Sequence, residues 1–383
     1  MAPRAQLVLL ALAQGVHGRS NILPLSATAA ANAASCPEDC QLNGECQLNG
    51  ECRCDPPWTG RSCGVFATLP AQHPAVYGYA PNVSSWGGSH WKDEAGDHHL
   101  FAAEMRTGGL AGWATNSQCV HAVAQDVSGP YRKRDTVLEP WCHGPQVLRH
   151  APTAEFLMVH VGSGGSQSSF MQHSKSLNGP WLAAATHPPG GCSMPCAAVH
   201  PNGTLFAVCG NGLAITSVTG DPTAAPWQAR WNPQRTLLQD HKRPSSEQGA
   251  WEDPDLWWDK RGHWHILFHV FPQGGATAST RLLRYSGHGW SRDGISWQFT
   301  SNSSQQPFNG TVDFVDGTST TYSTRERPHL IFADDSNRTT PVGVITAVSS
   351  QPVGTSCDTC VEKKCNACKI TPGLQNLGAE NEF

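Results

Sequence analysis

Two adjacent carboxylates precede a strand-like run of aromatic and apolar residues in the second half of the chain. Residues 251–269 read WEDPDLWWDKRGHWHILFH, with Glu252 and Asp253 directly before Pro254. A carboxylic acid held at such a position can protonate a leaving group in general acid–base catalysis. An Asp-Pro pair also favours a turn. Glu252 is therefore open to a catalytic and a structural interpretation, whereas Asp253 is expected to form the turn.

The same segment contains three histidines that could bind a metal ion. His263, His265 and His269 are separated by two and four positions, so on a strand they share one face. A zinc site would need the three rings to converge and leave a fourth position free. A half-buried strand that presents its histidines to a neighbouring sheet explains the spacing without a ligand. We expect no metal site and no cofactor.

A repeat of about 55 residues must position these groups. Similar segments begin at Ser85, Cys142, Cys196 and Glu252, at intervals of 57, 54 and 56 residues, and a fifth begins at Arg325. Each has a turn-forming start, a short apolar strand, a polar turn and a second strand, which is the pattern of antiparallel β-structure. No long stretch has helical periodicity. The repeat predicts an all-β five-bladed propeller over residues 75–350, because a β-sandwich would not explain the interval.

Six cysteines near the N-terminus indicate a small disulfide-rich module over residues 36–63. Their spacing is C-x3-C-x5-C-x5-C-x-C-x8-C, and the segment ends in CDPPWTGRSC. This pattern resembles an EGF-like domain, which implies the pairs Cys36–Cys46, Cys40–Cys52 and Cys54–Cys63. The acidic residues that calcium-binding members carry before the first cysteine are missing, so no calcium is expected. A zinc knuckle is the alternative, but it would leave two thiols without a role.

Four motifs in order resemble the five-bladed propellers of glycoside hydrolase family 43. They are NGPW from Asn178, EDP from Glu252, D-x-x-G-x-W from Asp259, and SRDGISW from Ser291. The resemblance implies inverting hydrolysis of arabinosides or xylosides by three carboxylates around a central channel. Glu252 matches the general acid.

Two of the three carboxylates implied by the family pattern are missing. The general base should lie at Trp86-Gly87-Gly88-Ser89 in the first unit, and the carboxylate that tunes the acid should lie near Gly144 in the second. Neither position has a carboxylate. Asp93 and Asp97 lie in register with the turn residue Asp259, and such turn carboxylates are expected to face away from the channel.

Aromatic residues beside the strand starts are expected to contact the sugar, because a flat apolar ring with a polar edge suits the apolar face of a sugar. Most of the other tryptophans are expected to pack between blades. The predicted substrate-binding residues are Trp86, Trp141, His143, Trp251, Asp253 and Arg327.

The N-terminus and the sequons indicate a secreted protein. An apolar run from Leu7 to Ala13 follows one positive charge and precedes small residues, as in a signal peptide over residues 1–18, with later cleavage sites up to residue 33. Fifteen cysteines in such a chain fit an oxidising compartment. Five glycosylation sequons agree with this location: Asn82, Asn202, Asn302, Asn309 and Asn337.

The remaining cysteines predict a latched C-terminal tail over residues 351–383. CDTCVEKKCNAC, ending at Cys368, has a central spacer too short for a zinc ribbon, so two disulfides are expected. Because the total of cysteines is odd, at least one thiol must be unpaired within the chain.

The amino-acid composition limits the classes of partner that the protein is expected to bind. The formal net charge is -4 and no long basic run occurs, which excludes an electrostatic footprint for nucleic acid. No membrane span is expected. Two functions remain: a secreted glycoside hydrolase that acts on a polysaccharide through Glu252, or a propeller with degraded catalytic residues that binds polysaccharide or glycoprotein glycans. In the second case the EGF-like module would act as a spacer, or as an adhesive element for an extracellular protein partner.

Overall fold

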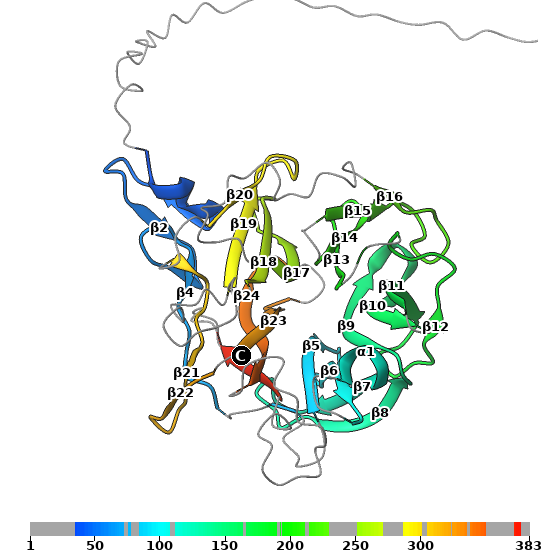
Figure 1. The fold of residues 1–383 in the computed structure, drawn as a ribbon. Helices are drawn as coiled ribbons and strands as arrows, with labels where there is room; N and C mark the ends of the chain where they lie inside the picture. Colours follow the sequence, from blue (N-terminus) through cyan, green and yellow to red (C-terminus); the bar gives the residue numbers. More distant parts are fainter. Residues whose placement is uncertain are drawn as a thin grey trace, which may run out of the picture.

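The computed structural model is an all-β protein in which four antiparallel sheets of four strands have a propeller-like arrangement (Figure 1). It describes residues 35–72, 76–77, 84–107, 112–163, 166–189, 192, 194–210, 214–229, 251–270, 286–300, 305–322, 324–334, 338–349 and 371–376. The predicted signal peptide, the cysteines of the C-terminal tail and the sequons at Asn82, Asn302 and Asn337 lie outside these residues.

The four sheets follow one another along the chain, and each pairs its strands in sequence order. The first sheet contains β5 (Ser84–Lys92), β6 (His98–Met105), β7 (Ser117–Ala124) and β8 (Arg132–Leu138). The second contains β9 (His143–His150), β10 (Glu155–Ser163), β11 (Ser166–Ser174) and β12 (Leu182–Ala183). The third contains β13 (Cys196–Val199), β14 (Leu205–Cys209), β15 (Ala214–Val218) and β16 (Gln228–Ala229). The fourth contains β17 (Trp251–Trp258), β18 (Trp264–Val270), β19 (Ser286–Ser291) and β20 (Gln298–Phe299).

A sheet of three strands lies between the fourth sheet and the first. It contains β23 (Thr324–Phe332), β24 (Pro341–Ser349) and β25 (Thr371–Asn376), and β23 contacts both β17 and β5. Figure 1 shows β23 and β24 in orange beside β17 and β5. Strand β25 comes from the segment that the sequence assigns to a cysteine-rich tail, so part of that tail completes a sheet.

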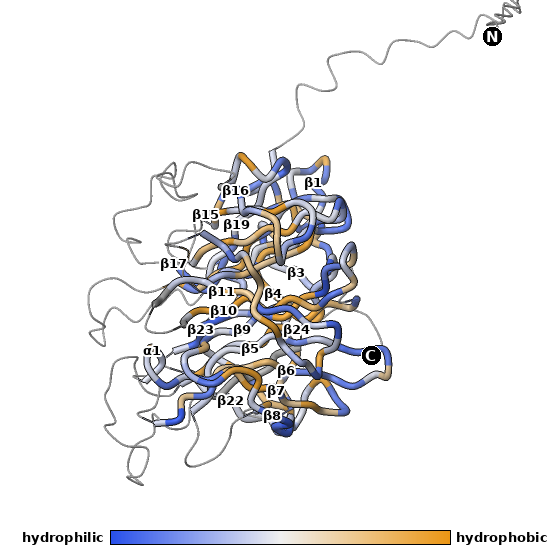
Figure 2. The backbone as a smooth tube through the Cα atoms, turned by 90° about the vertical axis from the view of Figure 1, so that its right-hand side faces the viewer, coloured by the Kyte–Doolittle hydropathy of each residue, from blue (hydrophilic) through white to orange (hydrophobic). Residues whose placement is uncertain are grey.

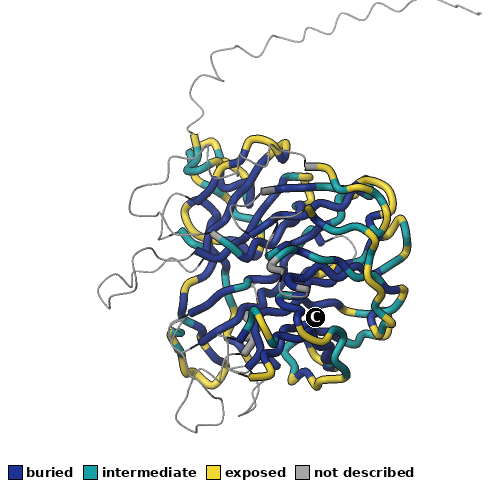
Figure 3. The backbone as a smooth tube through the Cα atoms, turned by 45° about the vertical axis from the view of Figure 1, so that its right-hand side comes forward, coloured by how far each residue is buried: buried dark blue, intermediate teal, exposed yellow. Residues whose placement is uncertain are grey.

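Apolar clusters fill the space between neighbouring sheets. Leu256 and Phe206 pack in one cluster between the third and fourth sheets, and Leu100 packs with Ile331 and Ile345 between the first sheet and the three-stranded sheet. Similar clusters join the first sheet to the second and the second to the third. Figure 2 shows the hydrophobic segments running along the strands, and Figure 3 shows buried strands with exposed turns at the periphery. Each of the four-stranded sheets and the three-stranded sheet therefore contributes to at least two apolar clusters.

The first strands of the sheets, β5, β9, β13, β17 and β23, line a central cavity of about 40 Å³, and we call them the channel strands. Each channel strand, or the segment of two residues before it, has one residue with positive φ near this cavity: Gly87, Gly144, Met194, Asp253 and Arg327. In β5, β17 and β23 the strand pairing shifts register at this point, as at a β-bulge. A bulge turns side chains that would otherwise alternate, so consecutive residues can face the same site.

Side chains two positions after four of these residues, Gly87, Gly144, Met194 and Asp253, connect neighbouring sheets. The Ser89 hydroxyl accepts a hydrogen bond from the Val147 backbone N–H at 2.9 Å. The Gln146 side chain accepts from the Ala197 N–H, Cys196 Sγ from the Leu256 N–H at 3.3 Å, and Asp255 Oδ2 from the Leu330 N–H at 2.6 Å. These sheet-to-sheet hydrogen bonds fix the channel strands relative to one another.

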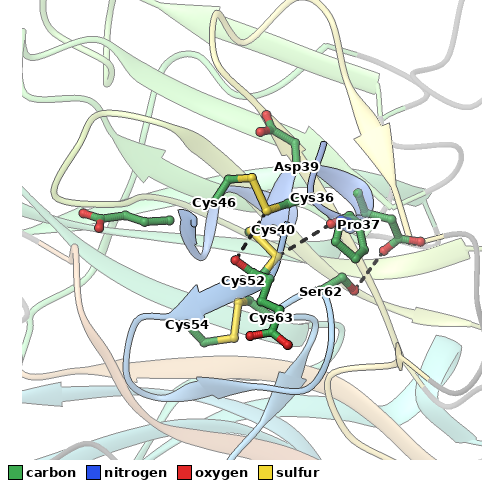
Figure 4. The surroundings of a disulfide bond; sticks show 12 residues. Cys36, Pro37, Asp39, Cys40, Cys46, Cys52, Cys54, Ser62 and Cys63 are labelled. Carbon is green, nitrogen blue, oxygen red and sulfur yellow. Dashed lines mark hydrogen bonds between the residues drawn. A yellow bond between two sulfur atoms is a disulfide. The ribbon is translucent and has the colours of Figure 1, made fainter. Parts of the chain in front are cut away.

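The cysteine-rich module, residues 36–63, has little secondary structure of its own. It contains the short helix η2 (Pro37–Leu42) and the pair β1 (Gly44–Cys46) with β2 (Cys52–Cys54). Its strand β3 (Trp58–Thr59) pairs with β4 (Val65–Phe66), which lies just after the module. Disulfides join Cys36 to Cys46, Cys40 to Cys52 and Cys54 to Cys63, the pairs that the EGF-like resemblance implies (Figure 4).

Smaller elements complete the described chain. They are the helices α1 (Trp113–Asn116) and η4 (Ala151–Thr153) and the hairpin of β21 (Thr311–Asp313) with β22 (Ser319–Thr321). Two further disulfides join strands to the segments that precede channel strands: Cys119 of β7 bonds to Cys142, just before β9, and Cys209 of β14 bonds to Cys192, which precedes β13. Cys196 is a buried free thiol. Asn202 and Asn309 are exposed. No helix in the described ranges is long and apolar enough to cross a membrane.

Candidate active site

The two carboxylates of the EDP motif lie where β17 meets the central cavity. Glu252 pairs with His269 of β18, and the register shift follows directly, between Glu252 and Asp255. Asp253 has φ +53° and is buried, and it lines the cavity together with Pro254. The predicted turn at Asp253 is therefore a bulge that directs its carboxylate into the protein.

Arg327 of β23 is the only described cation that lines the central cavity. Its Nη1 lies 3.4 Å from Asp253 Oδ1, and its Nη2 lies 2.8 Å from the sulfur of Met194. A Cβ at Gly87 would lie 2.8 Å from Arg327 Cδ, and a Cβ at Gly144 would overlap Nη1. The side chain thus contacts residues of all the other channel strands or the segments that lead into them.

Glu326 of β23 brings a further carboxylate to the site. Its Oε1 lies 3.9 Å from Nε2 of His269, while Nδ1 of the same ring lies 3.9 Å from Asp253 Oδ2. Both contacts are longer than hydrogen bonds. Burial, followed by the charge of Arg327, lowers the pKa of His269 to about 3, so the ring is neutral at physiological pH. His269 therefore lies near both carboxyl groups without forming a charged pair with either.

Burial makes the carboxyl groups of this site weak acids. Burial, followed by the neighbouring Asp253 carboxylate, raises the pKa of Glu252 to about 8, against the opposing effect of Arg327. Burial, then Asp253 and Glu252, raises the pKa of Glu326 well above its usual range. Burial also raises the pKa of Asp253, while Arg327 lowers it. Glu252 is consequently protonated at neutral pH, as a general acid must be.

The site contains a group of possible metal ligands. Ligand atoms of Glu252, Asp253 and His269 lie within 4.8 Å of one another. The guanidinium of Arg327 already contacts Asp253 and supplies a positive charge there. We therefore do not assign a metal centre to these residues.

Arg327 lies beside two glycines in the segments where the resemblance predicted further carboxylates. A side chain at Gly144 would collide with its guanidinium, and a side chain at Gly87 would press on its aliphatic stem. Both glycines also have positive φ, which most side chains disfavour. The space that the predicted base and tuning carboxylate would need is occupied by Arg327.

Several residues predicted to bind substrate are buried within the protein. The Trp86 ring is 2% exposed and packs with Met105 and Ala347, and the Trp141 ring is 7% exposed and donates a hydrogen bond to the Trp113 carbonyl at 2.6 Å. His143 is also buried, with Nδ1 2.8 Å from the Ser117 hydroxyl. The side chain of Trp251 lies outside the described residues. Sugar contact by these residues stays a prediction, whereas Asp253 and Arg327 adjoin Glu252.

The other two histidines of the β18 segment lie at the opposite end of the strand from His269. The Asp259 carboxylate accepts hydrogen bonds from the Arg261 and His263 N–H groups in the hairpin turn, and His263 Nδ1 lies 3.0 Å from it. His265 Nδ1 lies 3.0 Å from Nε2 of His288. Two of the three histidines thus support the sheet, as expected, while His269 belongs to the candidate site.

The residue that the sequence interpretation missed is Glu326. The signal was present, because Glu326-Arg327-Pro328 repeats the Glu-x-Pro order of Glu252-Asp253-Pro254. Both triplets carry a positive φ at the middle residue and a register shift after the glutamate. The two glutamates therefore occupy equivalent positions on neighbouring channel strands.

Solved structures that resemble this chain are glycoside hydrolases with the propeller fold. The catalytic domain of a family 62 α-L-arabinofuranosidase from Coprinopsis cinerea superposes with a TM-score of 0.58 at 13% identity, over 82% of this chain and 98% of that one. A family 62 hydrolase in complex with xylotriose gives 0.57 at 15% identity, over 82% and 98%. A thermostable family 43 glycoside hydrolase gives 0.51 at 12% identity, over 80% and 91%.

These identities are low enough that the likeness establishes the fold alone. No protein-family model and no curated protein sequence matches the chain. The sheets of this structure and the similar solved structures confirm the propeller arrangement expected from the repeat. The activity has to be argued from the site itself.

Proposed function

We propose that the protein is a glycoside hydrolase that acts on an arabinose- or xylose-containing polysaccharide, with Glu252 as the general acid. The observation that carries the proposal is a glutamic acid whose pKa is raised to about 8 by burial and a neighbouring carboxylate, at the inner edge of a propeller. A carboxyl group that is protonated at neutral pH can donate its proton to the leaving oxygen of the glycosidic bond.

The neighbouring folds support the choice of substrate. One similar structure, an α-L-arabinofuranosidase from Podospora anserina, was solved in complex with cellotriose, with a TM-score of 0.55 at 14% identity. Another was solved with xylotriose. We infer from these similar structures that this chain takes a polysaccharide and acts on its pentose units.

The architectural proposals extend the same likeness. We propose that the three-stranded sheet is the fifth blade, because it shares apolar clusters with the first and fourth sheets and contributes Arg327 to the central cavity. The module of residues 36–63 is proposed to be EGF-like, on its cysteine spacing and pairing. The disulfides among the described residues also support secretion.

A binding function without catalysis is the second candidate. It is favoured by Gly87 and Gly144, which lie where the family pattern would place the base and the tuning carboxylate. Such a protein would hold a glycan at the propeller and release it unchanged.

Hydrolysis by the secreted full chain separates the two candidates. We would assay 4-nitrophenyl α-L-arabinofuranoside, 4-nitrophenyl β-D-xyloside and arabinoxylan with the wild type, Glu252→Gln and the control Glu155→Gln. Glu155 lies on β10 beside His173, in another sheet. We expect the first variant to lose 10²- to 10⁴-fold in rate with little change in glycan affinity, and the control to keep the wild-type rate.

Each contrary result has its own meaning. Glycan binding without any wild-type hydrolysis would favour the second candidate. A wild-type rate that Glu252→Gln leaves intact would show that Glu252 is structural.

A further inference from the structure

A groove of about 1000 Å³ lies at the ends of three channel strands that point away from the candidate active site. Trp91, Arg149 and Phe332 line this groove, and each follows the positive-φ residue of its strand by four or five positions. Since a strand rises about 3.3 Å per residue, the groove lies roughly 13–17 Å along the strands from the central cavity. The proposed hydrolysis does not use this groove, whose volume is that of a ligand site.

The groove extends over the turns of three sheets. It includes the turns that follow β5, β11 and β23. Its apolar floor is formed by Trp91, Phe156 and Leu177, which pack in one cluster between the first and second sheets. The rings of Trp91 and Phe156 meet edge to face, with their centroids 5.4 Å apart. A groove with an aromatic floor and polar turns along its length suits an extended chain of sugar units.

The second sheet contributes two cations and no carboxylate to this groove. Phe156 of β10 pairs with Arg149 of β9 on one side and with Ser174 of β11 on the other, so Arg149 and Lys175 lie on either side of Phe156. Cζ of Arg149 is 4.8 Å from the centroid of the Phe156 ring. Neither the Arg149 nor the Lys175 side chain forms a hydrogen bond or an ion pair with another described residue. Both positive charges are therefore available to a ligand.

The carboxylates of the groove belong to the other two sheets. Lys92, Asp93 and Glu94 come from β5 and the turn that follows it, and Asp334 comes from the turn after β23. Oδ2 of Asp93 lies 3.2 Å from Nε2 of His99, so this carboxylate already has a partner within the first sheet. The groove thus has a cationic side on the second sheet and a side with carboxylate acceptors. A ligand that carries both a negative group and hydroxyl donors matches the two sides.

We propose that this groove binds an acidic polysaccharide through a uronate unit, whose carboxylate is bound by Arg149. A guanidinium that stacks on a ring with one face keeps the N–H donors of its edge free, and these donors fit a carboxylate with two parallel hydrogen bonds. Lys175 adds a second positive charge, and Glu94 accepts hydrogen bonds from sugar hydroxyl groups. The identification of the ligand as a polysaccharide rests on the proposed function, whereas the groove itself does not involve Glu252.

Isothermal titration calorimetry on the secreted full chain tests the site directly. The probes are a xylo-oligosaccharide with one glucuronic acid branch and the same oligosaccharide after reduction of the uronate to glucose. Arg149→Gln should lower the affinity for the acidic probe about 10- to 100-fold, the effect of losing hydrogen bonds to a charged group. Arg149→Lys should restore part of the affinity, because it keeps the charge without the fork of donors. The control is Arg132→Gln, at an exposed residue of β8 that does not line the groove.

Kinetics on large and small substrates test what the groove contributes. A polymer held at the groove has a raised local concentration at the candidate active site, whereas a small glycoside gains nothing from a remote anchor. Arg149→Gln should therefore raise KM for glucuronoarabinoxylan and leave kcat unchanged. Its rate on 4-nitrophenyl α-L-arabinofuranoside should equal that of the wild type.

The outcomes separate this inference from the function on which it rests. Thermal unfolding verifies that each variant is folded, and Lys175→Gln, at an exposed side chain, carries the test if Arg149→Gln does not fold. Equal affinity for the acidic and the reduced probe, or an affinity that neither substitution lowers, would overturn the site. Competition by poly-L-glutamate at the same strength would assign the groove to acidic peptides and overturn the polysaccharide. Binding of the acidic probe through Arg149 without hydrolysis of any glycoside would refute the proposed function and support the groove.

Discussion

The guanidinium of Arg327 controls the chemistry of the candidate site at the scale of single residues. It neutralises Asp253, moderates the pKa of Glu252 and Glu326, and fills the space beside Gly87 and Gly144. A charge placed there explains how three carboxyl groups can be crowded together in a buried site, since an isolated cluster would be costly. Removing a carboxylate from this cluster should therefore change the pH dependence of stability.

We expect Glu252→Gln to stabilise the protein more at alkaline than at acidic pH. The pKa of Glu252 is about 8 in the folded protein and about 4.5 in the unfolded chain. Between these values the folded state binds one proton more, so the wild type loses stability as pH rises and the loss is complete above pH 8. Glutamine has no such proton.

Melting temperatures of both proteins between pH 5 and pH 9 measure this effect. The advantage of Glu252→Gln should grow across the range, and Glu155→Gln should follow the wild type. A gap that stays constant with pH would mean that the carboxyl group of Glu252 titrates normally.

The repeated channel strand is the element that determines where functional side chains lie. As in Asp253-Pro254-Asp255, a residue with positive φ is followed by a proline or glycine and then by a residue whose side chain forms a hydrogen bond with the next sheet. Ser89 shows the same arrangement in the first sheet. The strand thus combines a bulge that exposes catalytic candidates with a hydrogen bond that holds the ring of sheets.

The sequence predicted the repeat of this element but not which side chains it would bring together. Intervals of 54 to 57 residues located the strand starts, and Glu252 was recognised at one of them. Regular alternation then placed His263, His265 and His269 on one face. In the structure, His263 lies in the hairpin turn before β18. His269 lies near Glu326 of the neighbouring sheet, where β23 has a bulge. A shift of one residue in the strand register moves each side chain to the other face of the sheet, and the sequence pattern does not specify such shifts.

Ser89 and Ser85 provide a matched test of the hydrogen bonds between sheets. Both serines are fully buried on β5, but only Ser89 accepts a hydrogen bond from the next sheet, and Ser85 Oγ has no hydrogen-bond partner among the described residues. Ser89→Ala leaves the buried Val147 N–H without an acceptor, which costs about 1–3 kcal/mol. Ser85→Ala should cost much less.

Urea unfolding of the two variants gives this comparison directly. Equal losses of stability in Ser89→Ala and Ser85→Ala would show that the bond between sheets contributes nothing specific.

At the scale of the whole molecule, the cysteine-rich module is part of the propeller's core. Gln41 Oε1 lies 2.9 Å from Nδ1 of His288, and Arg261 binds Asp55 and donates to the Leu42 carbonyl at 2.9 Å. Cys40, Trp58 and Phe66 share one apolar cluster with residues of the fourth and three-stranded sheets, including Trp257 and Leu330. The sequence suggested a spacer or an adhesive element, and a module that served only as a spacer would not need to bury its side chains in this way.

Contacts of this kind could not be predicted from the spacing of cysteines. The pattern predicts which sulfurs pair, because the module is too small to fold without staples. It does not indicate that Gln41 would contact a histidine almost 250 positions later, because this contact depends on how the module packs against the propeller. Strand β25 gives a second example, since residues of the predicted tail pair with β24.

We expect Trp58→Ala to destabilise the propeller as well as the module. The Trp58 ring is 7% exposed and stacks on Trp257 at 6.4 Å, with His288 at 5.0 Å, so its removal leaves a cavity between the module and the fourth sheet. Loss of a buried tryptophan costs about 3–5 kcal/mol. Because the cluster belongs to both parts, calorimetry should show one cooperative transition that moves to lower temperature. Leu48→Ala, at a residue of the same module that is 92% exposed, should leave the transition in place. A propeller transition unchanged by Trp58→Ala, with only a separate module transition lost, would contradict a shared core.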